Sequence, residues 1–231
     1  MRFLPSFLAV SLAAFLVRAD AQVRTVTKIA AKNQAGEETV AVLVDTNDAP
    51  DLAEWGKRAG GLCVEWLPKI AALLPSEGFV PAKQVTLYFD PKMKGVAATT
   101  GTRITIAADW VKMHPDDFGM VIHELTHVLQ DYRGKGEGWL TEGIADYVRY
   151  WHFEPGTRQF TITRVKSSYR QGYGVAGAFL DWLERTKHKG IVVKLNGASR
   201  KGEYKPEMFE MLCEKKLDTL WDEFVEASAK P

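Results

Sequence analysis

The chain has 231 residues, of which 46% are hydrophobic and 26% are charged, and its formal net charge is +1. This composition supports a globular core and excludes a long disordered or low-complexity chain. The near-neutral charge argues against nonspecific binding to nucleic acid or to anionic membranes.

Residues 1–21 have the features of a signal peptide. Arg2 is followed by an apolar run that reaches Val17, and Ala19-Asp20-Ala21 fits a small-x-small cleavage pattern. The run is too short to anchor the chain in a membrane. We therefore expect a secreted or periplasmic protein that begins at Gln22, is formally neutral and is not associated with a membrane after cleavage.

After the leader, we expect residues 22–37 to form a loose polar lead-in, and residues 38–231 to form a single domain. Residues 39–46 have the composition of a strand. From Pro50 to Leu73 the apolar residues recur at threes and fours, which predicts a helix that faces the core. Glycines and a proline within it count against a regular helix.

Two further strands are predicted at residues 85–89 and 103–106. The alternation of polar and apolar residues in the second is typical of a half-exposed or edge strand. The rest of the chain has mainly helical patterns. Strands followed by helices predict an α+β fold, with a small mixed or antiparallel N-terminal sheet and a helical C-terminal half.

The segment His123-Glu124-Leu125-Thr126-His127 is an H-E-x-x-H motif. It lies in a predicted helix that begins near Pro115 and ends near Tyr132. The four-residue spacing places both imidazoles on one helical face, where they can bind one ion, and Glu124 is placed to accept a proton from water. Zinc needs a third protein ligand and an open fourth position. The alternative is a helix with two incidental histidines.

A second helix is predicted from Trp139 to Val148, where Glu142 and Asp146 share one face. Its apolar neighbours indicate a packed helix, in which carboxylates need partners. Here the chain resembles the gluzincin (thermolysin-like) zinc peptidases, in which a downstream helix supplies a glutamate in an E-x-x-x-D pattern. The resemblance implies that Glu142 is the third zinc ligand and that Asp146 orients the imidazole of His123. An ordinary solvated helix face is the alternative.

The resemblance becomes more specific over residues 121–130 and 142–149, at Gly172-Tyr173 and over residues 178–183. These segments are similar to the basic secretory protein family, the peptidases of plants and bacteria, and the similarity covers the chain from about Val42 onward. It implies a zincin-like fold with an active-site helix, Zn²⁺ as cofactor, and a peptide or protein as substrate.

A donor for the oxyanion of the reaction is expected near Ser168. Ser168 and Gln171 predict a capping box, so that a helix begins here with Tyr169 and Tyr173 on the same face. Zinc aminopeptidases that resemble gluzincins have their oxyanion tyrosine in a Tyr-x-x-Gly pattern, which matches Tyr169, whereas the Gly-Tyr pattern of the basic secretory proteins favours Tyr173. We expect one of the two to act; the alternative is that both only pack.

Several questions stay open at this stage. Cys63 and Cys213 either pair, as an exported protein allows, or are two small buried residues. The other histidines are expected at the surface or as caps, and an extended substrate is expected to pair with an edge strand at residues 97–100 or 103–106. The alternatives to a zinc peptidase are a zinc hydrolase of a non-peptide bond and a non-catalytic secreted defence or wall-binding protein with a structural zinc. Glu124 counts against the last, because a structural site needs no base.

Overall fold

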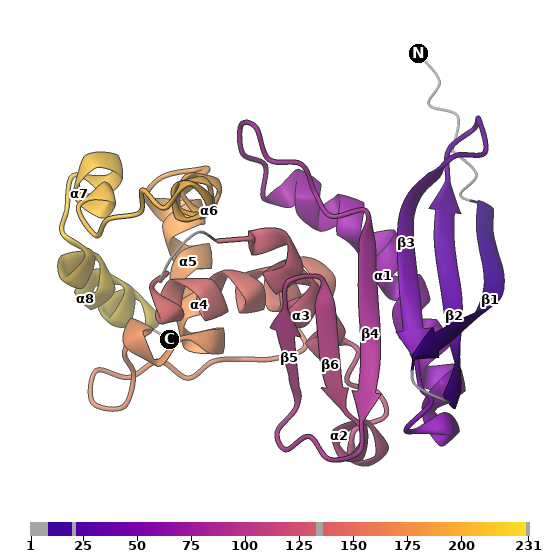
Figure 1. The fold of residues 1–231 in the computed structure, drawn as a ribbon. Coiled ribbons are helices and arrows are strands. Elements are labelled where there is room, and N and C mark those ends of the chain that lie inside the picture. The colour runs from indigo at the N-terminus through magenta and orange to yellow at the C-terminus, as the bar shows by residue number, and fades with distance from the viewer. Residues whose placement is uncertain (1–8, 20–21, 133–135, 230–231) are drawn as a thin grey trace. The chain divides into compact units, whose positions relative to one another are not determined.

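A computed structural model describes residues 9–19, 22–132 and 136–229 of the chain, and the side chains from Arg24 onward (Figure 1). Its contacts divide the chain into two compact units, each of which combines two segments. The first unit is Met1–Lys69 with Pro81–Val128, and the second is Ile70–Val80 with Leu129–Pro231. Each unit is described by itself below, and the predicted single domain from residue 38 stays a prediction.

The first unit contains a six-stranded sheet with the strand order β1-β2-β3-β4-β6-β5. The pairs β3–β4 and β4–β6 are parallel and the other pairs are antiparallel, so the sheet is mixed. Together with the helical C-terminal half, this confirms the predicted α+β class. The strands are β1 (Ala9–Ala19), β2 (Gln22–Lys32), β3 (Glu38–Asp45), β4 (Gln84–Asp90), β5 (Ala97–Thr100) and β6 (Arg103–Ala107).

The N-terminal part of the sheet differs from the expected loose lead-in. Residues Gln22–Lys32 form strand β2, which pairs with β1 on one side and β3 on the other. The segment is rich in β-branched residues, which favour a strand in spite of the charged residues among them. Its backbone N–H and C=O groups form hydrogen bonds with the two neighbouring strands. Strand β1 lies within the predicted leader, so that in a chain cleaved after Ala21 the edge strand would be β2.

The edge of the sheet near the proposed site is β5. The alternating segment at β6 was expected to be half-exposed or an edge strand, but β6 lies between β4 and β5. Its exposure does alternate at the start, with Arg103 exposed and Ile104 buried. Strand β5 covers residues 97–100, one of the two segments expected to offer an edge strand.

Helix α1 (Ala53–Leu73), which follows the single turn Pro50–Leu52, is continuous through its glycines and through Pro68. Two of these glycines lie on the face of the helix that packs against the sheet. A Cβ added at Gly56 would lie 2.8 Å from Val44 Cγ1, and one added at Gly60 would lie 2.7 Å from Ile29 Cδ1. The glycines therefore let the helix approach the sheet closely.

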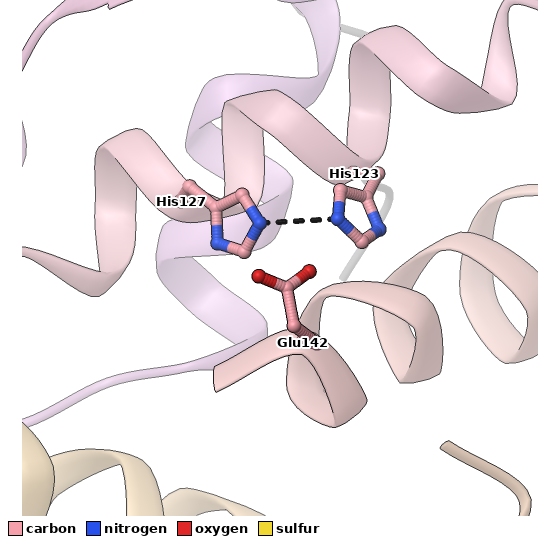
Figure 2. A group of neighbouring side chains, drawn as sticks. All are labelled: His123, His127 and Glu142. Carbon is pink, nitrogen blue, oxygen red and sulfur yellow. Dashed lines mark hydrogen bonds between the residues drawn. The ribbon is translucent and has the colours of Figure 1, made fainter. Parts of the chain in front are cut away.

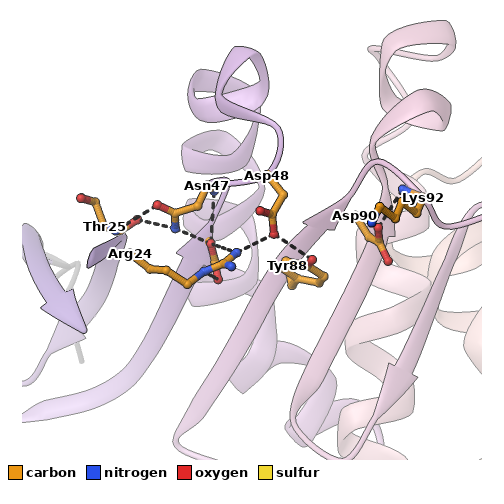
Figure 3. A network of polar contacts seen from close by, with 8 residues as sticks. Arg24, Thr25, Asn47, Asp48, Tyr88, Asp90 and Lys92 are labelled. Carbon is orange, nitrogen blue, oxygen red and sulfur yellow. Dashed lines mark hydrogen bonds and ion pairs between the residues drawn. The ribbon is translucent and has the colours of Figure 1, made fainter. Parts of the chain in front are cut away.

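A polar network ties the start of β2 to the ends of β3 and β4 (Figure 3). The Arg24 guanidinium lies 3.3 Å from Asp45 and 2.6 Å from Asp48, and the hydroxyl of Tyr88 donates to Asp48 at 2.9 Å. The hydrogen bond from Arg24, followed by that from Tyr88, lowers the pKa of Asp48. The network holds together strands that are distant in sequence.

The motif helix α3 (Gly119–Gln130) begins later than predicted and follows a short helix α2 (Ala108–Met113). Pro115 lies in the turn before α3, where its carbonyl accepts a hydrogen bond from the Trp55 indole at 2.7 Å. Asp117 accepts from the backbone N–H of Met120 at 3.2 Å and caps the helix instead. Proline at residue 115 was therefore a misleading start signal.

The second unit is helical. Helix α4 (Gly138–Val148) continues as the π-helix Arg149–Phe153, a single 3₁₀ turn covers Tyr169–Gln171, and α5 (Tyr173–Thr186) follows. A Cβ added at Gly143 on α4 would lie 2.7 Å from Ala176 Cβ on α5, so these helices pack closely. The remaining helices are α6 (Ile191–Lys201), α7 (Met208–Cys213) and α8 (Leu217–Ser228).

Both cysteines are free thiols, so the pairing left open by the sequence does not form here. Cys63 is buried in α1, and Cys213 is half-buried at the end of α7. Among the described residues, no helix combines the length and apolar character needed to cross a membrane.

Candidate metal centre

The two histidines of the motif project from one face of α3, one turn apart. His123 is buried and His127 is half-buried. Their Nε2 atoms lie 3.0 Å apart, with the two rings nearly perpendicular at 85° (Figure 2). Two ligands of one tetrahedral zinc ion are separated by about 3.3 Å, given Zn–N bonds of about 2.0–2.1 Å. The histidines are therefore spaced to share one ion.

Glu142 on α4 completes a group of three potential ligands. One ligand atom from each of His123, His127 and Glu142 lies within 4.8 Å of the others (Figure 2). It is the one group of this kind among the described residues. Two imidazoles and one carboxylate are the protein ligands typical of a zinc ion that keeps an open position. The residues present therefore fit zinc.

The side chain of Glu142 is supported from behind by the backbone at Gly172. A Cβ added at Gly172 would lie 3.3 Å from Glu142 Cβ and 3.6 Å from Trp139 Cα. Gly172 has φ 71° and ψ −156°, a combination open essentially only to glycine. This residue therefore allows the chain to pass close to Glu142, the third potential ligand.

Two polar side chains fix the last turn of α3. The Gln130 amide, which is 2% exposed, donates to the carbonyl of Thr141 at 2.8 Å, next to Glu142. The buried guanidinium of Arg200 on α6 donates to the carbonyl of Leu129 at 2.6 Å and to that of Leu74 at 2.6 Å. The unpaired carbonyls at the end of α3 are thus bound by a residue distant in sequence.

Glu124 is buried beside the histidines and has one identified polar partner from the sheet. The hydroxyl of Thr99 on β5 lies 2.6 Å from Glu124 Oε2 and 3.1 Å from the carbonyl oxygen of the same residue. A buried carboxylate needs a hydrogen-bond donor. Thr99 supplies it.

The two tyrosines lie in different environments, so the prediction that they share a helix face was wrong. The predicted capping box of Ser168 and Gln171 is present, but it starts only a 3₁₀ turn. Gly172 then interrupts the helix, and α5 begins at Tyr173. Tyr169 is 3% exposed and donates to Asp218 at 2.7 Å, whereas Tyr173 is 58% exposed.

Tyr169 and Tyr173 also differ in chemistry. Burial, followed by the hydrogen bond to Asp218, raises the pKa of the Tyr169 phenol. Its proton is therefore held by a carboxylate of α8. Tyr173 has φ 49°, an uncommon value for a residue with a side chain, and such conformations gather at functional sites.

The remaining predicted positions are as follows. Asp146 is buried on α4, one turn beyond Glu142. His114 is exposed and stacks on Trp110, whereas His152 is half-buried and its Nε2 has no hydrogen-bond partner among the described residues, contrary to the expected surface role. Burial lowers the pKa of His152, so its neutral form is favoured.

Comparison with known proteins identifies the family to which the chain belongs. A search of curated proteins finds no match. A family profile described as peptidases of plants and bacteria, BSP, matches residues 23–224, which is most of the chain. The resemblance predicted from the sequence is thereby confirmed: the chain belongs to the BSP family of peptidases of plants and bacteria.

Proposed function

We propose that this protein is an exported zinc-dependent peptidase with a zincin-like fold. His123, His127 and Glu142 would hold the ion, and Asp146 would orient the imidazole of His123. The observation that carries the proposal is the group of two imidazoles and one carboxylate within 4.8 Å of one another. Membership of a peptidase family supports the reaction class.

The chemistry follows from the groups around this cluster. When bound, zinc supplies a Lewis acid that lowers the pKa of water and polarises the scissile carbonyl. Glu124 accepts the proton of the attacking water and passes it to the leaving amine. For the oxyanion we assign Tyr173 as donor, because the proton of Tyr169 is bound by Asp218.

An extended peptide substrate would pair with β5, the edge strand. The backbone N–H of Ala107 donates to the carbonyl of Val96, which makes these two a hydrogen-bonded pair. Because such pairs alternate along an antiparallel ladder, the N–H and C=O groups of Ala97 and Thr99 point away from β6. They are the groups that a substrate strand would bind.

The decisive experiment is hydrolysis of a denatured protein and a peptide library by the purified zinc-loaded protein. We expect cleavage that a chelator abolishes and added zinc restores. Glu124→Gln should lower kcat by about 10²–10⁴-fold and still bind zinc. Glu65→Gln, a change of an exposed residue on α1, is the control.

Other outcomes would lead to the two alternative functions. Cleavage of ester or amide panels without cleavage of any peptide would indicate a hydrolase of a non-peptide bond. Stoichiometric zinc with no hydrolysis at all, in the wild type as in Glu124→Gln, would indicate the non-catalytic defence or wall-binding protein. Export is tested by the N-terminal sequence of the secreted protein, expected to begin at Gln22.

A further inference from the structure

We propose that Thr99 is a positioning residue that fixes the carboxylate of Glu124 for proton transfer; this rests on the proposed peptidase function. Thr99 Oγ1 lies 2.6 Å from Glu124 Oε2. That distance is within the range of a hydrogen bond from a hydroxyl to a carboxylate oxygen. The bond joins β5 to α3, and both Thr99 and Glu124 lie in the first unit.

The strand geometry explains why Thr99 can reach the base. Successive side chains of a strand point to opposite faces. Along β5, Ala97 and Thr99 are half-buried while Ala98 and Thr100 are exposed. Thr99 therefore belongs to the inner face of the strand. The same hydroxyl lies 3.1 Å from the backbone carbonyl oxygen of Glu124, so β5 approaches α3 closely at this point.

The hydrogen bond restricts one carboxylate oxygen and leaves the other available. A threonine hydroxyl has one proton, and the shorter of the two contacts shows that this proton is donated to Oε2. Proton transfer is therefore assigned to Glu124 Oε1, the carboxylate oxygen that Thr99 does not bind. Without the hydroxyl, the terminal torsion of Glu124 is broad and the carboxylate rotates between orientations.

One residue thus takes part in two tasks. The backbone of Thr99 faces the free edge of β5, where a substrate strand would pair, and its hydroxyl holds the base. Replacing the hydroxyl leaves the backbone groups in place. A positioning role therefore predicts a loss in kcat without a matching change in KM.

The test uses three variants of the full zinc-loaded protein. Thr99→Val removes the hydroxyl at nearly constant volume, and Thr99→Ser keeps it. Thr86→Val on β4 is the matched control, a half-buried threonine of the same sheet. We expect Thr99→Val to lower kcat by about 10- to 100-fold, with KM and zinc affinity unchanged. Thr99→Ser should restore most of kcat, and Thr86→Val should match the wild type.

A second measurement does not depend on activity. In crystal structures of the zinc-loaded protein, Glu124 Oε2 should lie within hydrogen-bond distance of Thr99 Oγ1 in the wild type and take another orientation in Thr99→Val. An unchanged kcat in Thr99→Val, a failed rescue by Thr99→Ser, or a carboxylate turned away from Thr99 in the wild type would each overturn the proposal. If wild type and Glu124→Gln are equally inert, the peptidase function fails, and the crystal structures alone decide whether Thr99 holds Glu124.

Discussion

Gly172 lies directly against Glu142, the proposed third metal ligand: a Cβ added there would meet Glu142 Cβ at 3.3 Å. The same glycine has a backbone conformation that other residues avoid, at φ 71° and ψ −156°. A single position thus carries both a steric and a conformational requirement for the cluster.

Gly172→Ala should therefore lower both stability and zinc affinity. The backbone strain alone costs about 1–3 kcal/mol, and the new methyl group displaces Glu142. Urea unfolding and competition for zinc with a chelating dye measure the two effects. Gly156→Ala is the control, because it has φ 79° but open space around an added Cβ. It should lose stability and keep its zinc affinity. Equal zinc affinity in both variants would contradict the role of Gly172.

The two tyrosines should separate by kinetics and stability. Tyr173→Phe should lower kcat by about 10²–10³-fold, because it removes the proposed oxyanion donor. The unfolding free energy should change little, because the side chain is exposed. Tyr169→Phe should lose about 1 kcal/mol of stability, because it removes the bond to Asp218, and should keep kcat. Steady-state kinetics and denaturant unfolding check the pair, and the reverse pattern would assign the oxyanion role to Tyr169.

Zinc binding should stabilise the folded chain through the three ligands. At a zinc concentration about 100-fold above Kd, the unfolding free energy should rise by about 2.7 kcal/mol, which is about 5–10 °C in Tm. Chelation should reverse the shift. His127→Ala and Glu142→Ala should reduce it strongly, whereas His114→Ala should not. A full shift in His127→Ala would place the ion elsewhere.

The buried thiol of Cys63 should make the protein sensitive to alkaline pH. Burial raises the pKa of this thiol from 9.0 to about 12. The folded state therefore keeps a proton that the unfolded state releases, and stability is present below pH 9 and lost as the pH rises toward 12. Between pH 8 and pH 10 the loss of unfolding free energy from this group is on the order of 1 kcal/mol. Unfolding at both pH values should show a smaller loss in Cys63→Ala, and equal losses would contradict the assignment.

Much of the fold could be predicted where the pattern is local. The periodic apolar residues of α1 and the short β-branched strands β3 and β4 were recognised because their own sequence defines them. Strand β2 was not, because its pairing with β1 and β3 outweighs its polar composition. The start of α3 was placed too early, because the cap at Asp117 competes with the signal from Pro115.

In the candidate site, too, the features defined by local sequence were predicted and those that depend on tertiary contacts were not. The spacing of His123 and His127 within one helix is visible in the sequence. The contact of Thr99 with Glu124 was missed because it joins residues 25 apart in different elements, and no periodicity links them. The prediction that Tyr169 and Tyr173 share a helix face was wrong. The helix is interrupted at Gly172 by its backbone conformation, which the capping box does not reveal.

The guanidinium of Arg200 has a practical consequence for shortened forms of the protein. A chain that stopped before α6 would retain His123, His127 and Glu142, but the carbonyl of Leu129 would lose its donor. The end of the motif helix would then fray. Trimming the C-terminus should therefore abolish metal retention although no ligand is deleted, and affinity tags are better placed after Ser228 than within the helical tail.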